Sequence, residues 1–357
     1  MATEAIKSGT ESGKAMHKWA LYPLQAALVL SVIALHTSAL AAQHKHASST
    51  SDRRIVRLDP RFDMLVPRDA VLEKIADGFA WVEGPVWNRK GGFLLFSDVP
   101  NNSIFKWKAG EGVSLFLKSS GYTGTEPFPG REPGSNGLAF DREGRLVFCQ
   151  HGDRRISRLE KDGSRTTLVD RYLGKRINSP NDLVFRSNGD LYFTDPPFGL
   201  PQAFEDPQKE IDFQGVYRLS TDGKLALLTK EEAPNGIAFS PDEKILYVSD
   251  SKRTVWLAFD VGKDGTFSNR RVLFDGSEVG KGKPGVADGM KVDAHGNIFG
   301  AAPGGLYVIA PDGKLLGRFD LGTATGNSAW GEDGSTLFIT SNTAVYRIRL
   351  HTKGAGF

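Results

Sequence analysis

Six polar residues recur at similar intervals along the chain, and each carries a side-chain oxygen atom. They are Glu83, Asn136, Asn181, Asn235, Asp288 and Asn327, and the steps between them are 53, 45, 54, 53 and 39 residues. If the fold brings them together, two carboxylates and four carboxamides without histidine or cysteine suit a hard divalent cation. Calcium accepts such oxygens in flexible geometry, whereas magnesium demands a stricter one and zinc usually binds nitrogen or sulfur. The pattern therefore predicts one divalent cation, with Ca²⁺ favoured and Zn²⁺, Mg²⁺ or Mn²⁺ as alternatives.

Turn formation offers a second explanation for these residues. Four of the six precede a glycine, and Asn-Gly and Asp-Gly are common turn dipeptides. Glu83, however, is a poor turn former, and separate turns such as DREG at 141–144 and DAHG at 293–296 occur inside the repeats. We therefore favour a metal site over turn formation.

Short strands must position these residues. Each polar residue opens an apolar strand-like run, which is followed by a turn and a second β-rich run, as in NGIAFS from Asn235 and then ILYVSD from Ile245. Two further strand-like runs complete most repeats. A period near 40–55 residues with about four strands per unit is typical of propeller blades. The sequence therefore predicts an all-β, six-bladed β-propeller over residues 71–350.

The two ends of the repeat region suggest how the ring closes. The last repeat offers only three strand-like runs, whereas the stretch VLEKIADGF at residues 71–79 precedes the first complete repeat. We expect residues 71–79 to supply the missing outer strand of the last blade, which would remove an exposed sheet edge.

The N-terminal region differs in kind from the repeats. Residues 24–35 are an uncharged, mostly apolar run, preceded by Lys18 and followed by an A-x-A site at residues 39–41, which is the layout of a secretory signal peptide. We expect an exported protein, periplasmic or secreted, without a stable membrane partner after cleavage. An uncleaved membrane anchor is the alternative. The parts outside the propeller are predicted to be a signal peptide over 1–42 (with Met16 as a possible start), a flexible linker over 43–70 and a tail over 351–357.

Composition excludes several other classes of protein. The formal net charge is only +3, and no basic run is interleaved with aromatic residues, so nucleic acid is not expected as a partner. The single cysteine, Cys149, excludes an intramolecular disulfide and a cysteine metal cage. The sequence does not indicate an oligomeric state.

Several motifs resemble the senescence-marker-protein, gluconolactonase and regucalcin-like family. They are EGPVW from 83, NSPNDLVF ending at 185, FTDPPFG from 193, PNGIAFSPDEKILYVSD ending at 250 and ADGMKVDAHGNIF ending at 299. In that family, and in the similar diisopropyl fluorophosphatase, one catalytic ion is held by a Glu, two Asn and an Asp. The resemblance implies a metal-dependent hydrolase of a lactone, most simply a sugar lactone. The ligands that it implies here are Glu83, Asn181, Asn235 and Asp288.

The resemblance also implies a catalytic role for Asp288, as general base or water positioner, although a pure ligand role is the alternative. A phosphotriesterase using the same ion, or a non-catalytic calcium-binding propeller, stays open. Two long insertions, residues 121–134 and 196–215, are expected to cover the mouth of the channel.

Further side chains near that mouth have expected roles. A small lactone or ester substrate is expected to contact Asn136, His151 and Arg131. Asp195 and Asp250 stand at the ends of second strands, where they either orient the metal ligands or form turns.

Overall fold

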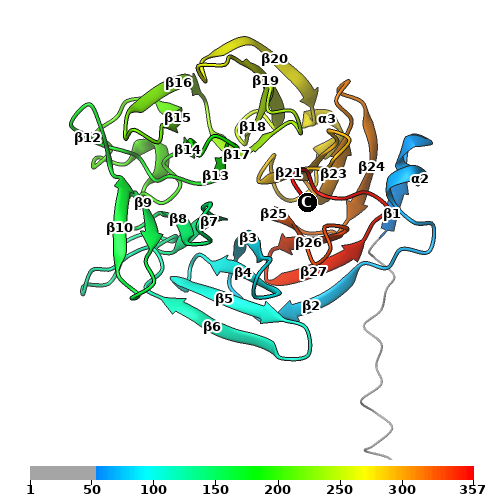
Figure 1. The fold of residues 1–357 in the computed structure, drawn as a ribbon, viewed down its shortest axis with the longest axis horizontal. Helices are drawn as coiled ribbons and strands as arrows, with labels where there is room; N and C mark the ends of the chain where they lie inside the picture. The colour runs from blue at the N-terminus through cyan, green and yellow to red at the C-terminus, as the bar shows by residue number, and fades with distance from the viewer. Residues whose placement is uncertain (1–53) are drawn as a thin grey trace, which may run out of the picture. The chain divides into compact units, whose positions relative to one another are not determined.

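The structure, a computed structural model, describes residues 54–357. In this part of the chain, six antiparallel sheets are arranged around a common centre (Figure 1). In each sheet, the first strand of the repeat lies innermost. Each innermost strand contains one of the six recurring polar residues near its start or begins two residues after it. The all-β, six-bladed propeller predicted from the repeats is confirmed.

The first three blades occupy the cyan and green parts of the ribbon (Figure 1). Blade 1 contains β3 (Val82–Asn88), β4 (Phe93–Asp98), β5 (Ser103–Lys108) and β6 (Gly112–Lys118). Blade 2 contains β7 (Ser135–Phe140), β8 (Leu146–Gln150), β9 (Arg155–Leu159) and β10 (Arg165–Val169), followed by a small hairpin of β11 (Arg171–Tyr172) and β12 (Lys175–Arg176). Blade 3 contains β13 (Leu183–Phe185), β14 (Leu191–Asp195), β15 (Gln214–Leu219) and β16 (Leu225–Glu231), with the 3₁₀ turn η2 (Ala203–Glu205) in its long insertion.

The remaining blades complete the ring. Blade 4 contains β17 (Pro234–Phe239), β18 (Ile245–Asp250), β19 (Val255–Val261) and β20 (Phe267–Asp275), followed by α3 (Ser277–Gly280). Blade 5 contains β21 (Met290–Val292), β22 (Ile298–Ala302), β23 (Gly305–Ile309) and β24 (Leu315–Asp320). Blade 6 contains β25 (Thr325–Gly331), β26 (Thr336–Ser341) and β27 (Ala344–Arg349).

The core lies between the blades. In the described residues, buried apolar side chains form six clusters, and each cluster joins two neighbouring blades. The contact between the last and first blades is as apolar as the others, because Trp87 of β3 stacks on Phe338 of β26 with ring centroids 5.3 Å apart. Burial of apolar surface therefore holds the ring together all the way round.

An N-terminal strand pairs with the last blade. β2 (Glu73–Asp77) lies within the predicted segment 71–79 and pairs antiparallel with β27, from Glu73 opposite Arg347 to Asp77 opposite Ala344. It is the outermost strand of blade 6 (Figure 1). That the ring depends on this pairing for its closure stays a prediction.

We expect deletion of residues 71–79 to abolish cooperative unfolding, because it exposes the edge of β27 and the apolar cluster between blades 6 and 1. Thermal unfolding followed by circular dichroism measures this. Glu73→Gln is the matched control, since it removes only the exposed ion pair with Arg347, which contributes about 1 kcal/mol or less. A truncated protein that melts like the intact one would contradict the expectation.

The prediction of a flexible linker over 43–70 is wrong for residues 54–70, the part of it that the structure describes. β1 (Arg54–Arg57) adds a fifth strand to blade 5 by pairing with β24, and α2 (Arg61–Leu65) buries Phe62 against Phe319. These elements are only four and five residues long, too short to produce a recognisable periodicity. Tertiary contacts with blade 5 stabilise them instead.

The C-terminal tail also packs on the propeller. Thr352 donates a hydrogen bond to Asp293 Oδ2 (2.9 Å), and Gly354 forms a β-bridge with Asp293. The predicted signal peptide, residues 1–42, lies outside the described residues. Within residues 54–357, no helix is long and apolar enough to cross a membrane.

Candidate functional site

Five of the six recurring polar residues meet at one cavity. Glu83, Asn136 and Asn235 lie in the inner strands β3, β7 and β17, whereas Asn181 and Asp288 lie two residues before β13 and β21. All five are buried, and all five line a cavity of about 360 Å³. We call these five residues the cavity floor. The sixth, Asn327 in β25, is buried but does not line the cavity.

The asparagines of the floor form a chain of amide hydrogen bonds. Asn136 Nδ2 donates to Asn181 Oδ1 (2.9 Å), and Asn181 Nδ2 donates to Asn235 Oδ1. Asn235 Nδ2 in turn donates to Ser251 Oγ (3.0 Å). An amide oxygen has two lone pairs, so Asn235 can accept one hydrogen bond and still bind a cation. Asn181 Oδ1 also lies 3.2 Å from His151 Nε2, so its second lone pair is free in the tautomer that carries the imidazole proton on Nδ1. Asn136 Oδ1 is buried without a hydrogen-bond partner.

Glycines next to the floor residues let the blades approach closely. A Cβ on Gly236 would lie 2.5 Å from the backbone oxygen of Asp288, and a Cβ on Gly289 would lie 2.0 Å from Asn327 Cγ. Neither glycine has a positive φ. At these two positions the Asn-Gly and Asp-Gly pairs therefore serve close packing at the channel rather than a left-handed turn.

Hydroxyl groups hold the backbone of three floor residues. In each case the hydroxyl belongs to the second strand of one blade, and its acceptor is the carbonyl oxygen of the floor residue in the next blade. The three bonds are Ser97 Oγ to Asn136 O (2.9 Å), Thr194 Oγ1 to Asn235 O (2.6 Å) and Ser249 Oγ to Asp288 O (2.8 Å). Blades 1, 3 and 4 thus each fix the backbone of a floor residue in the next blade.

The aspartates that follow these hydroxyls hold the loops inside their own blades. Asp195 Oδ2 accepts the Asn178 N–H (2.8 Å), and Asp250 Oδ2 accepts the N–H groups of Glu232 and Ala233 (3.1 and 3.3 Å). These loops lead directly into Asn181 and Asn235. Asp195 and Asp250 therefore act on the backbone that precedes the floor residues, and burial raises the pKa of Asp195 to about 7.

The two carboxylates of the floor are buried without a compensating positive charge. Burial is the largest cause of the raised pKa of Glu83, and the negative charge of Asp288 adds to it. Burial likewise raises the pKa of Asp288, with further contributions from the charges of Glu132 and Asp182. Lys252, which also lines the cavity, pairs with Glu232 instead (3.2 Å).

This donor set fits a divalent cation. Two buried carboxylates supply two negative charges, and the asparagines supply neutral oxygens, which is a ligand set for a hard ion. Within residues 54–357, no three His, Cys, Asp or Glu side chains gather into a metal-binding cluster. The floor contains only two such side chains, because its other donors are carboxamides.

His151 and Arg131, two of the expected substrate contacts, do not line the cavity. His151 is fully buried, with Nε2 3.2 Å from Asn181 Oδ1 and Nδ1 3.0 Å from Glu132 Oε2. Arg131 is exposed outside the cavity, whereas its neighbour Glu132 lines it. Asn136 does line the cavity, as expected of a substrate contact.

Asn327 belongs to a polar group inside the channel. Its Nδ2 donates to Asp182 Oδ2 (3.2 Å), and Lys291 Nζ donates to its Oδ1 (3.2 Å). Lys291 Nζ also lies 3.9 Å from Asp182 Oδ2. Asn327 therefore bridges the Lys291 ammonium group and the Asp182 carboxylate rather than facing the cavity.

Sequence reasoning missed two kinds of functional residue. The hydroxyl-bearing residues were detectable, because a Ser-Asp or Thr-Asp pair ends the second strand in FSD, FTD and VSD, at residues 96–98, 193–195 and 248–250. Glu132 and Trp81, which also line the cavity, lie in irregular segments without a repeat signal. Phe198 and Phe204 line the cavity from the insertion 196–215, which agrees with its expected place over the mouth.

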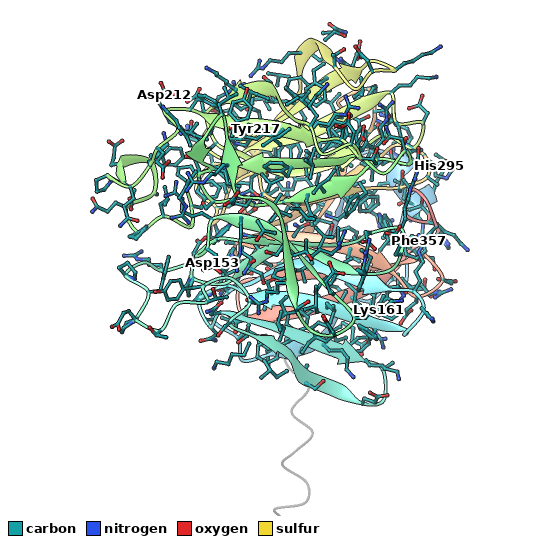
Figure 2. All side chains as sticks on the ribbon, turned by 60° about the vertical axis from the view of Figure 1, so that its left-hand side comes forward. Asp153, Lys161, Asp212, Tyr217, His295 and Phe357 are labelled. Carbon is teal, nitrogen blue, oxygen red and sulfur yellow. The ribbon has the colours of Figure 1, made fainter. Side chains whose placement is uncertain are left out.

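The two faces of the ring differ in their loops (Figure 2). Asp153, close after His151, and Asp212, near the end of the insertion 196–215, lie toward one side. His295 and Phe357 lie toward the opposite side, where the DAHG turn and the tail pack together (Figure 2). The end of the insertion 196–215 therefore lies toward the face opposite the DAHG turn and the tail.

Comparison with known proteins places the whole repeat region in one group. The family described as the SMP-30/gluconolactonase/LRE-like region matches residues 81–343. A gluconolactonase from Zymomonas mobilis is 43% identical over 329 residues, covering 89% of this chain and 91% of that protein. The diisopropyl-fluorophosphatase of Loligo vulgaris is 24% identical over 314 residues, covering 80% and 94%. The structure of a gluconolactonase from Xanthomonas campestris, 32% identical, superposes with a TM-score of 0.72 over 84% of this chain and 95% of that one.

Proposed function

Since the chain belongs to the SMP-30/gluconolactonase/LRE-like family, we propose that it is a metal-dependent hydrolase of sugar lactones. The observation that carries the proposal is the cavity floor, where Glu83 and Asp288 are buried beside three asparagines without a cationic partner on the cavity wall. The substrate class is supported by the gluconolactonase relatives, which match nearly the whole repeat region.

The ligands proposed for the cation are Glu83, Asn181, Asn235 and Asp288. When bound there, a divalent cation supplies Lewis-acid polarisation of a carbonyl oxygen and lowers the pKa of water. Ca²⁺ is the proposed ion, because carboxylate and amide oxygens in an adaptable arrangement are its usual ligands.

The residues of the chain then perform the other parts of the reaction. Asn136 is proposed to hold the lactone through its side chain, whose Oδ1 has no partner within the protein. Asp288 Oδ1 accepts the Gly289 N–H (3.0 Å), and Asp288 would hold the cation through one carboxylate oxygen and take the proton of the attacking water with the other. The water oxygen adds to the carbonyl carbon, the ring C–O bond breaks, and the proton passes to the departing ring oxygen to give the open hydroxy acid.

A substrate panel tests this proposal. We expect the purified protein to contain a divalent cation by elemental analysis and to hydrolyse aldonolactones, with activity lost in EDTA and restored by Ca²⁺. An aryl ester and a phosphotriester belong in the same panel, because the diisopropyl-fluorophosphatase relative makes organophosphate hydrolysis the second candidate. Turnover of the phosphotriester alone would favour that candidate. Turnover of no substrate in the presence of cation would favour a binding protein.

A further inference from the structure

The insertion 121–134 contributes one carboxylate to the cavity, in addition to the four ligands proposed for the cation. Glu132 lines the cavity together with Glu83 and Asp288, and its side chain is 34% exposed. Its charge contributes to the raised pKa of both floor carboxylates, so it faces the same space. Unlike those two, it lies on a loop and is open to solvent, where a substrate can reach it.

His151 lies directly behind Glu132, close enough for an ion pair, although its Nδ1 does not have the geometry of a hydrogen bond to the carboxylate. His151 Nδ1 lies 3.0 Å from Glu132 Oε2, and Nε2 lies 3.2 Å from Asn181 Oδ1. His151 is fully buried, and Gly199 of the other insertion covers it, since a Cβ on Gly199 would lie 2.4 Å from His151 Cβ. The imidazole therefore cannot touch a substrate, but it contacts the Glu132 carboxylate on one side and Asn181 of the floor on the other.

Apart from Glu132 and the floor, Ser251 is the one lining residue whose side chain can accept a hydrogen bond, and its hydroxyl already accepts one from Asn235 Nδ2. Trp81, Phe198 and Phe204 present aromatic surface, and Phe198 and Phe204 pack edge to face with centroids 6.0 Å apart. Aromatic rings suit the C–H face of a ring-shaped substrate, but they discriminate poorly between a substrate with hydroxyl groups and one without. A carboxylate accepts hydrogen bonds only, so it recognises hydroxyl donors.

We propose that Glu132 is the specificity-determining residue of this cavity, that it accepts hydrogen bonds from the hydroxyl groups of polyhydroxylated lactones, and that His151 is its positioning residue. The proposal rests on the lactonase function proposed above and deepens it. In this proposal Glu132 contacts the substrate, whereas His151 and Arg131, which were expected to contact it, do not.

Glu132→Gln tests the role of the carboxylate. Wild type and variant are compared on glucono-δ-lactone and on δ-valerolactone, which has the same ring size without hydroxyl groups, at saturating Ca²⁺. We expect kcat/KM to fall about 10-fold for glucono-δ-lactone, because hydrogen bonds to a charged group are the stronger kind. For δ-valerolactone we expect a change of less than about twofold, within the range of ordinary surface substitutions.

The matched control is Glu126→Gln, an exposed glutamate of the same insertion that does not line the cavity, and we expect it to leave both substrates unchanged. Equal losses on both lactones would overturn the proposal, because Glu132 would then act on the reaction or the cation. Unchanged kinetics on both would overturn it too. If the wild type hydrolyses neither lactone, the proposed function itself fails, which is a separate result.

His151→Gln tests the positioning role. The readout is the ratio of kcat/KM for the two lactones, since a merely structural loss lowers both rates and leaves that ratio in place. We expect His151→Gln to lower the ratio, and the double variant with Glu132→Gln to lower it no further than Glu132→Gln alone. An unchanged ratio, or independent effects in the double variant, would show that His151 does not act through Glu132.

Discussion

Glu83→Gln is expected to lower kcat/KM for lactone hydrolysis by about 10²–10³-fold or more, the range seen when one stabilising group is removed from a reacting centre. The substitution keeps the shape of the side chain but removes one of the two floor charges. Glu83 is only 2% exposed, and its carboxylate accepts the Gly84 N–H (3.1 Å), so glutamine must fit the same site with an amide. Calorimetric titration with Ca²⁺ should show a matching loss of affinity.

Asp288→Asn separates the two roles left open for that residue. If Asp288 is a base, the variant keeps Ca²⁺ binding and loses hydrolysis. If Asp288 is only a ligand, binding and hydrolysis fall together, as expected for Glu83→Gln. Glu126→Gln, exposed on the insertion 121–134, serves as the charge-matched control. A Glu83→Gln protein with full activity would contradict the site.

Stabilisation by Ca²⁺ is expected to grow as the pH rises from 5 to 7.5. Burial raises the pKa of Glu83 and Asp288 in the cation-free protein above their ordinary values. Between the ordinary and the raised pKa the folded state binds more protons than the unfolded state, so the cation-free protein loses stability as the pH rises. A bound cation compensates the ionised pair and reverses that loss.

Differential scanning calorimetry with Ca²⁺ and with EDTA, at both pH values, measures this effect. At pH 7.5 and a free Ca²⁺ concentration 100 times Kd, linkage gives about 2.7 kcal/mol of stabilisation, or a rise in Tm of about 5–10 °C. At pH 5 we expect a smaller rise, because protons compete for the same oxygens. Glu83→Gln is the control, since it should weaken both the pH dependence and the Ca²⁺ effect. An equal rise at both pH values would contradict the expectation.

The repeat made the fold predictable, whereas the parts that lack a repeat were not. Six similar strand pairs identify the blades, and the position of Asn235 or Asp288 within its repeat is enough to place it at the channel. The segment containing β1 and α2 has no such pattern, because its conformation depends on contacts with blade 5. Glu132 was not predicted for the same reason: it lies in the insertion 121–134, outside the repeated strand pairs.

The difference between Asn327 and its five counterparts is also physical. Its sequence context matches theirs, but Lys291 and Asp182 engage its side chain inside the channel. Lys291 is one of the residues of the inner strand β21, and its sequence context does not reveal that its amino group turns inward. Side-chain direction of this kind follows from packing and not from the repeat.

The ligands proposed for the cation come from blades 1, 3, 4 and 5, and the blades fix one another through hydroxyl-to-carbonyl bonds. A growing chain therefore acquires its donors in order, and Asp288 is made last of the four. Contacts between segments so far apart in sequence form slowly, because a long loop must close first. We therefore expect the proposed cation site to be a late product of folding, and a chain interrupted before blade 5 to carry three of the proposed donors but no complete site.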